Sequence, residues 1–299
     1  MTVKDFFLAL FVVVVWGVNF VVIKVGVSEV PPFLLGALRF SLVAIPAIFF
    51  VKRPNVPLRW LLCYGLTISF GQFAFLFFAI KSGMPAGIAS LVLQAQAFFT
   101  ILLGALFLSE SLKWHHIVGI IVASTGMYFL AGTEGSSDVA VGLSFTTMLL
   151  TLAGAFCWSL GNISNKVIMR NNNVPVLSLV VWSALIPVLP FLVFSWFFEG
   201  KEAIVYSLQN IRFQSVFSIF YLAFVATIMG YGIWGYLLGR YETWRVAPLS
   251  LLVPVVGMIS AAVLLGETLN AQQVFGAVVV IVGLLLTVFG GSLKRLQRG

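Results

Sequence analysis

Residues 84–112, MPAGIASLVLQAQAFFTILLGALFLSESL, form an apolar run that carries no charged side chain before Glu110. At 1.5 Å of rise per residue, a helix over this run is long enough to cross a hydrocarbon core about 30 Å thick. Two amide side chains, Gln94 and Gln96, lie near its middle, where an amide without a hydrogen-bonding partner is costly. The run therefore predicts a membrane-spanning helix whose polar side chains face protein or a cavity.

A variant of the same run returns at residues 241–269, YETWRVAPLSLLVPVVGMISAAVLLGETL. Glu267 matches Glu110 at a distance of 157 positions (267 − 110). The same offset places Leu112 on Leu269, Gly119 on Gly276 and Gly126 on Gly283. The chain therefore holds two copies of one unit.

The front of each copy also matches. Trp16 and Lys24 correspond to Trp158 and Lys166, 142 positions later (158 − 16). The smaller offset reflects a longer loop around residues 199–213 in the second copy. Because each copy holds five spans, an odd number, the second copy enters the membrane from the opposite face. Such inverted repeats are typical of secondary transporters, whose substrate site lies near the midplane between the repeats.

Composition identifies the class of protein. Hydrophobic residues make up 61% of the chain and charged residues 9%, and the mean hydropathy is +1.10. A soluble domain is about half apolar and a quarter charged. The net charge of +8 is assigned to basic loops facing an anionic lipid surface rather than to nucleic-acid binding. Cys63 and Cys157 lie in apolar runs with no metal-ligand spacing, so neither a disulfide nor a metal or other cofactor is expected.

The predicted fold is an all-α integral membrane protein of ten transmembrane helices in two inverted five-helix repeats, residues 1–137 and 138–299. The predicted spans are 5–25, 32–51, 60–80, 84–108, 115–131, 143–165, 175–198, 215–238, 246–265 and 272–292. The segments between them, including Gly200 to Arg212, are expected to be loops.

Loop charges set the expected orientation. Of the 17 Lys and Arg residues, Arg39 lies within a span and four lie on one side of the membrane: Lys24, Lys81, Lys201 and Arg212. The remaining twelve lie on the side of the N terminus. Positively charged loops stay in the cytoplasm, so both termini are expected there, and the loop with Glu134 and Asp138 is expected outside.

Two segments carry a family resemblance. SESLKWHHIVGIIVASTG and GETLNAQQVFGAVVVIVG are similar to the segments that end each repeat of the EamA family of the drug/metabolite transporter superfamily. Within that family, WGVNFVVIKVG, GMPAGIASLVLQAQAFFT and GYLLGRYETWRVAPLSLLVPVVG resemble the bacterial O-acetylserine and cysteine exporters. The resemblance implies export of amino acids and related metabolites across the bacterial inner membrane. It also helps to select helices one, three, four, six, eight and nine as the expected lining of a central cavity.

The first candidate residues are tryptophans beside amides. Trp16 and Asn19 share one helix face, as do Trp158 and Asn162. This pattern predicts either a pocket wall that hydrogen-bonds a zwitterion or interhelical packing in which the asparagines bond to a neighbouring backbone.

Glutamines supply the next candidates. In a regular helix Gln94 and Gln96 are about 200° apart, so we expect only one of them to face a cavity. Gln72 in the third span is a candidate partner for either. Tyr231 and Trp234, in a glycine-rich helix that contains Gly235-x-x-x-Gly239, reach either the cavity or the lipid.

Arg39 lies about 10 Å inside the second span. It either binds a substrate carboxylate through its planar fork, or pairs with a carboxylate or with carbonyls, or extends outward to the interface. Glu110 and Glu267 end their spans, and a loop or capping role is favoured over carrying a coupling proton. For Lys24 and Lys166 the alternatives are interfacial anchoring and gating contacts to substrate or carboxylates.

These features predict a secondary exporter that works by alternating access on a small amino-acid-like substrate in a lipid bilayer, with proton coupling as one candidate. A broader drug or cation exporter would require a carboxylate in mid-span, and a sugar-phosphate or nucleotide-sugar exchanger would require several basic residues at the cavity. An intramembrane enzyme would require a buried catalytic set, but both histidines lie at one interface and no aspartate lies in mid-span. ATP drive in this chain is excluded by the absence of the G-x-x-x-x-G-K-[ST] motif.

Overall fold

The computed structural model describes residues 1–131, 144–171 and 174–296, and within these ranges it contains helices and no strand. In the described parts of the chain, eight helical stretches are long and apolar enough to cross a membrane: Val3–Glu29, Leu58–Lys81, Ala86–Leu108, Phe145–Arg170, Val176–Glu199, Phe213–Arg240, Pro248–Leu265 and Ala271–Gly291. Two shorter apolar helices, Pro32–Ala47 and Trp114–Leu130, complete the set. Each of the ten predicted spans falls on one of these stretches, so the predicted fold class is confirmed.

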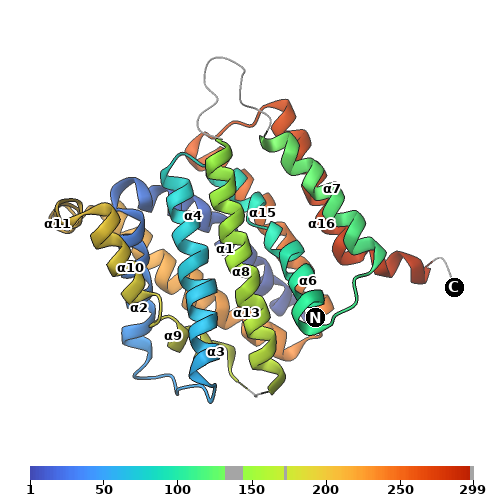
Figure 1. Cartoon of the computed structure of the whole chain (residues 1–299), viewed down its shortest axis with the longest axis horizontal. Helices are drawn as coiled ribbons and strands as arrows, with labels where there is room; N and C mark the ends of the chain where they lie inside the picture. The colour runs from blue at the N-terminus through green and yellow to red at the C-terminus, as the bar shows by residue number, and fades with distance from the viewer. Residues whose placement is uncertain (132–143, 172–173, 297–299) are drawn as a thin grey trace.

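Several spans are built from more than one helical element (Figure 1). The elements up to residue 131 are α1 (Val3–Glu29), α2 (Pro32–Ala47), α3 (Leu58–Tyr64), the π-helical η1 (Gly65–Gly71), α4 (Gln72–Lys81), α5 (Ala86–Val92), α6 (Ala95–Leu108) and α7 (Trp114–Ala131). Those after residue 143 are α8 (Phe145–Asn171), α9 (Val176–Ser183), α10 (Val188–Phe194), the π-helical η2 (Ser195–Glu199), α11 (Lys201–Gln209), α12 (Phe213–Phe220), the π-helical η3 (Tyr221–Met229), α13 (Gly230–Arg240), α14 (Thr243–Val246), the 3-10 helix η4 (Ala247–Leu252), α15 (Val253–Leu265) and α16 (Ala271–Leu296).

The two copies share the local structure that ends their fourth spans. Ser109 after α6 and Gly266 after α15 both adopt the left-handed conformation, with φ of 54° and 66°. The next amide folds back in the same way: Glu110 N donates to Gly104 O at 3.2 Å, and Glu267 N donates to Ala261 O at 3.3 Å. Each of these positions is 157 residues from its counterpart (266 − 109, 261 − 104). The offset found in the sequence therefore corresponds to one repeated helix end.

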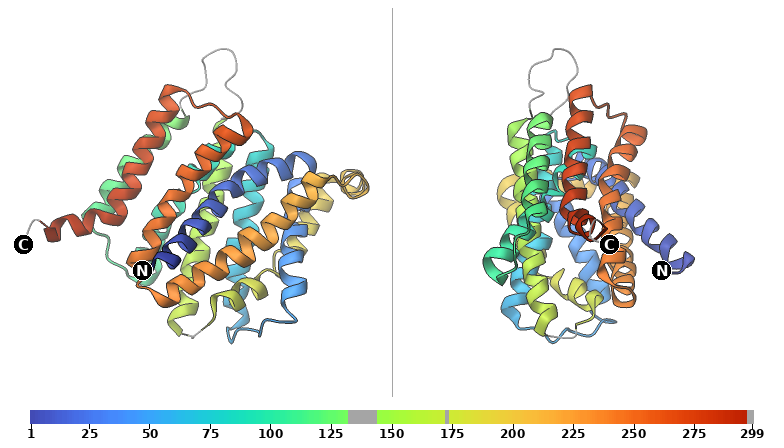
Figure 2. Two further views of the ribbon diagram at one scale, coloured as in Figure 1. Left: turned by 180° about the vertical axis from the view of Figure 1, so that it is seen from behind. Right: turned by 90° about the vertical axis from the view of Figure 1, so that its right-hand side faces the viewer.

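The counterpart helices α7 and α16 lie side by side and run in opposite directions, as Figures 1 and 2 show. Glycines from the two repeat-related helices face one another, although each meets a glycine other than its own counterpart. A Cβ on Gly126 would lie 2.7 Å from Gly276 O, and a Cβ on Gly119 would lie 2.7 Å from Gly283 O. Only hydrogen fits at these positions, so the backbones approach closely enough to pack without large side chains. This antiparallel pairing is the relation that an inverted repeat requires.

Two features differ from the sequence-based expectation. The exposed helix α11 occupies part of the segment between Gly200 and Arg212 that was expected to be a loop. A loop was expected there because the polar composition of this segment resembles that of a loop. In the expected G-x-x-x-G contact the Cβ position of Gly235 lies 3.0 Å from Val176 Cβ, whereas that of Gly239 meets nothing among the described atoms within 4 Å. The predicted boundary at 137/138 and the Glu134/Asp138 loop lie outside the described residues and stay predictions.

Candidate functional site

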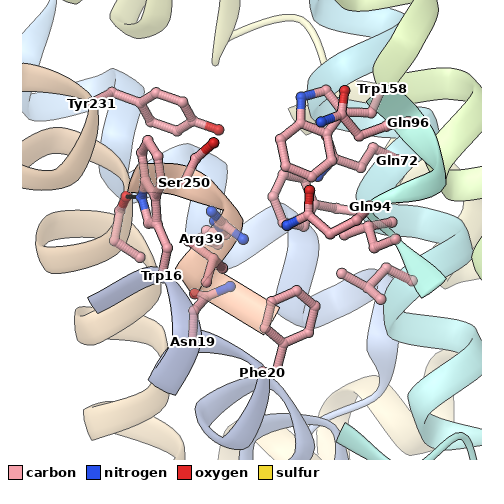
Figure 3. Close-up of a pocket in the computed structure, with 15 residues that line it drawn as sticks. Trp16, Asn19, Phe20, Arg39, Gln72, Gln94, Gln96, Trp158, Tyr231 and Ser250 are labelled. Carbon is pink, nitrogen blue, oxygen red and sulfur yellow. Dashed lines mark hydrogen bonds between the residues drawn. The ribbon is translucent and has the colours of Figure 1, made fainter. Parts of the chain in front are cut away.

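Both halves of the chain contribute to a cavity inside the helical bundle (Figure 3). Its volume of about 110 Å³ is several times what one water molecule needs, so it can hold a small metabolite. The lining side chains are Trp16, Asn19, Phe20, Arg39, Gln72, Phe73, Leu76, Leu93, Gln94, Gln96, Trp158, Ala226, Tyr231, Ser250 and Val253. Most are apolar or aromatic, with amides and one cation among them.

Eight of the ten predicted candidates line this cavity: Trp16, Asn19, Arg39, Gln72, Gln94, Gln96, Trp158 and Tyr231. The other two, Asn162 and Trp234, lie behind the wall. Ser250 was missed, although it is the repeat counterpart of Leu93 (250 − 93 = 157), which also lines the cavity. Arg39 adds helix two to the expected lining set.

One wall is built on Trp16. Its indole Nε1 donates to Ala226 O at 3.0 Å, where the π-helical η3 passes α1. The rings of Tyr231 and Trp234 each lie 5.2 Å from the Trp16 ring. Trp234 therefore supports Trp16 from behind, while Tyr231 reaches the cavity itself (Figure 3).

Gln94 and Gln96 both reach the cavity, so the expectation that only one would do so is wrong. The reason is a break between α5 and α6. Here Gln96 N bonds to Leu93 O at 3.1 Å and Ala97 N bonds to Gln94 O at 2.9 Å, both spanning three residues instead of four. This tighter turn rotates the two side chains toward the same side.

Asn162 fixes the orientation of Gln96. Its Nδ2 donates to Gln96 Oε1 at 2.7 Å and to Thr100 Oγ1 at 3.1 Å. Since the carboxamide oxygen of Gln96 is held by this bond, its NH₂ group is left to face the cavity. Asn162 is therefore a positioning residue and not a lining residue.

Arg39 is 2% exposed, so it does not extend outward to the interface. Its Nη2 donates to Thr227 Oγ1 at 2.9 Å, and its guanidinium carbon lies 4.0 Å from the centre of the Phe73 ring. The buried Nε and Nη1 atoms have no hydrogen-bond partner among the described residues. No acidic side chain in the described ranges forms an ion pair with Arg39. A structural carboxylate pair within those ranges is thereby excluded.

Two acceptors in the same cavity are also unpaired. Asn19 Oδ1 and Gln72 Oε1 are buried and lack a hydrogen-bond partner within the described parts of the chain. A buried polar atom without a partner costs about 1–3 kcal/mol. Unpaired donors and acceptors gathered in one cavity are typical of a binding site whose ligand supplies the missing bonds.

The two repeat-related glutamates have different partners. Glu267 caps α5, accepting from Ala86 N at 2.8 Å and Gly87 N at 3.0 Å. Glu110 instead pairs with the end of α8, through Lys166 Nζ at 3.0 Å and Arg170 Nη2 at 3.4 Å. The capping role is thus confirmed for Glu267, and Lys166 makes the carboxylate contact that was one of its two alternatives.

The family model described as "EamA-like transporter family" matches two segments of the chain, residues 4–132 and 145–289. The chain belongs to the EamA-like transporter family. Two bacterial relatives are named as probable amino-acid metabolite efflux pumps. The one from Salmonella typhimurium is 62% identical and aligns over 100% of this chain and 99% of its own length. The one from Escherichia coli is 59% identical and aligns over 97% of this chain and 96% of its own length.

A solved crystal structure shares the fold of this EamA protein. It has a TM-score of 0.65 and 20% identity, and the alignment covers 99% of both chains. The protein is accordingly a multi-pass membrane protein of a transporter family, and its long apolar helices suit a lipid bilayer.

Proposed function

We propose that the protein exports amino acids and related small metabolites, cysteine and O-acetylserine among them, across the bacterial inner membrane. The observation that carries this proposal is the cavity between the halves, where two guanidinium nitrogens of Arg39 and two amide oxygens find no partner among the described residues. The names of the two bacterial relatives support the same substrate class. A sugar-phosphate or nucleotide substrate is less well matched, because Arg39 is the one cationic side chain among the cavity-lining residues described.

We infer alternating access because the repeat-related glutamates make different contacts at the two ends of the bundle. The terminal end is where α1 begins and α16 ends, and the opposite end is where α5 begins and α15 ends (Figure 1). At the opposite end, α5 packs against α15 and Glu267 caps α5. At the terminal end, Glu110 is bound to α8 instead. An inverted repeat allows the mirror arrangement at a similar free energy. The observed arrangement is the proposed outward-closed form, and its mirror arrangement is the proposed outward-open form.

The mirror arrangement follows from the sequence offsets. The counterparts of Ala86 and Gly87 are residues 243 and 244 (86 + 157, 87 + 157), whose backbone amides begin α14. Lys24 is the counterpart of Lys166, and its Nζ now lies 3.5 Å from Ile80 O. In the other state Glu110 would cap α14 and Glu267 would pair with Lys24. Each glutamate thus exchanges a helix cap for an ion pair.

The substrate assignment is tested by uptake of labelled cysteine and O-acetylserine into inverted membrane vesicles. If both termini are cytoplasmic, as the loop charges predict, export from cells becomes uptake into such vesicles. Vesicles that contain the protein should accumulate both compounds above control vesicles, and dissipating the proton gradient should reduce accumulation if protons are coupled. Uptake equal to that of control vesicles for both compounds would contradict the substrate assignment.

Replacing Asn162 with alanine tests the role of Gln96. The substitution removes the donor that holds Gln96 Oε1, so the amide is free to turn away from the cavity. One hydrogen bond of this kind is worth about 1 kcal/mol, so the KM for labelled cysteine should rise about fivefold with the folded fraction unchanged. Asn165→Ala, on the same helix but outside the cavity lining, is the matched control and should leave the KM unchanged. Equal KM values for the two variants would show that Asn162 has no positioning role.

A further inference from the structure

The guanidinium of Arg39 retains one complete hydrogen-bonding edge. Nη2 carries two N–H bonds and gives one to Thr227 Oγ1. The other Nη2 hydrogen shares an edge either with Nε–H or with an Nη1 hydrogen, and neither Nε nor Nη1 has a partner among the described residues. Whichever hydrogen Thr227 takes, one edge remains with two parallel N–H donors. Two such donors match the two oxygens of a carboxylate.

The surroundings hold this edge in place without satisfying it. Phe73 lies under the guanidinium at 4.0 Å and Phe40 at 5.2 Å, contacts that fix its plane by cation–π attraction. Neither ring carries an N or O acceptor, and the Nε and Nη1 atoms have no hydrogen-bond partner among the described residues. A buried positive charge that pairs with no carboxylate of the described residues is costly, so an anion that enters the cavity gains from neutralising it.

The cavity that Arg39 lines also holds two acceptors for the other end of a zwitterion. Asn19 Oδ1 and Gln72 Oε1 have no partner in the part of the chain that the structure describes, and Trp16, Trp158 and Tyr231 line the same space. In Figure 3 Asn19 and Trp16 appear on the same side as Arg39, with Gln72 and Trp158 across the cavity. Carbonyl oxygens and indole faces both attract an ammonium group.

From these contacts we propose that Arg39 binds the α-carboxylate of the exported metabolite, while Asn19, Gln72 and the tryptophans receive its α-ammonium group. This assignment rests on the proposed function and adds the feature by which the substrate is recognised. The substrate side chain is left with the apolar remainder of the cavity, formed by Phe20, Leu76, Leu93 and Val253. The site therefore selects small zwitterionic α-amino acids and rejects the corresponding amines.

The test compares two probes that differ only in the carboxylate: reduced L-cysteine and cysteamine. Transport of each is measured in proteoliposomes containing the full chain, and the ratio of kcat/KM values gives the preference for the carboxylate. Because both values come from one preparation, a reduced folded fraction cancels from the ratio. The wild-type protein should prefer cysteine by about 10- to 100-fold, as expected for a charge-assisted bond.

Three variants then locate the preference. In Arg39→Gln it should collapse to within a few-fold of unity, and in Arg39→Lys, which keeps the charge but loses the fork, it should be intermediate. Thr227→Val removes the bond that positions Nη2 and should lower the preference partially. This third variant carries the test if Arg39→Gln does not fold.

The outcomes separate the two proposals. If the wild-type protein prefers cysteine, but Arg39→Gln keeps that preference, or Thr227→Val keeps it where Arg39→Gln does not fold, Arg39 is not the carboxylate anchor and the export function stands. If the wild-type protein transports cysteamine as well as cysteine, the anchor is likewise overturned. If it transports neither probe nor O-acetylserine, the proposed function fails and the anchor fails with it.

Discussion

Gly126→Leu is expected to lower the accumulation of folded protein in the membrane at least several-fold. A Cβ at this position would lie 2.7 Å from both Gly276 O and Val280 N. Both are backbone atoms of α16, so no side-chain rotation relieves the overlap. Helices in lipid associate through close packing and not through the hydrophobic effect, so a helix pair forced apart loses what holds it together.

The measurement is the height of the monodisperse size-exclusion peak of a fluorescent-protein fusion extracted in mild detergent. For Gly126→Leu the peak should fall at least several-fold, because destabilised protein is removed by cellular proteases. Gly239→Leu is the matched control, since the Cβ position of that helical glycine meets no atom of the described residues within 4 Å. Wild-type peak height for Gly126→Leu would mean that α7 and α16 do not pair as they do here.

Much of the fold was predictable because the bilayer restricts the choices. Span lengths and the duplicated Glu-x-Leu and glycine spacings were enough to predict ten spans in two copies. The offset aligned Gly126 with Gly283, but the contact is between Gly126 and Gly276. An alignment shows which residues are equivalent, whereas contact depends on how the equivalent helices meet.

The site was less predictable, and the reasons are local. Gln94 and Gln96 reach the same cavity because the helix breaks between α5 and α6. The regular 3.6-residue period used for the sequence does not predict such a break. The sequence placed Asn162 on the helix face that points toward the cavity. Its side chain bonds to Gln96, however, and therefore lies behind the residues that line the cavity. Arg39 was an open choice because depth alone does not reveal partners. The structure narrows the choice, since its carboxylate partner would have to lie outside the described residues.

Glu267→Gln is expected to open the end of the bundle where α5 meets α15. In the observed state the carboxylate of Glu267 accepts two backbone N–H bonds from α5. A neutral amide accepts more weakly, and the difference of about 1.4 kcal/mol corresponds to a tenfold change in the ratio of the two states. Ser90 of α5 is 0% exposed and packs against Gly257 of α15, so its accessibility reports on this closure.

The experiment uses Ser90→Cys in a background in which Cys63 and Cys157 are alanine, labelled in intact cells with a membrane-impermeant maleimide. Adding Glu267→Gln should raise the labelling rate by about an order of magnitude. Lys24→Gln should lower it up to a few-fold, because it removes an ion pair proposed only for the other state, and exposed ion pairs are worth about 0–1 kcal/mol. Glu29→Gln breaks an ion pair with Arg212 at the same end and should leave the rate unchanged.

The opposite signs of the two substitutions distinguish exchange from simple loosening. If Glu267 only tied α5 to α15, Lys24 would have no effect on closure, because its Nζ forms no ion pair with any described carboxylate in the observed state. If Lys24 only anchored α1 at the interface, Lys24→Gln would loosen the bundle and raise the labelling rate. Only a partner switch of Glu267 from the amides of α5 to Lys24 makes one substitution accelerate labelling and the other slow it. Labelling accelerated by both variants would therefore refute the exchange while leaving the cap intact.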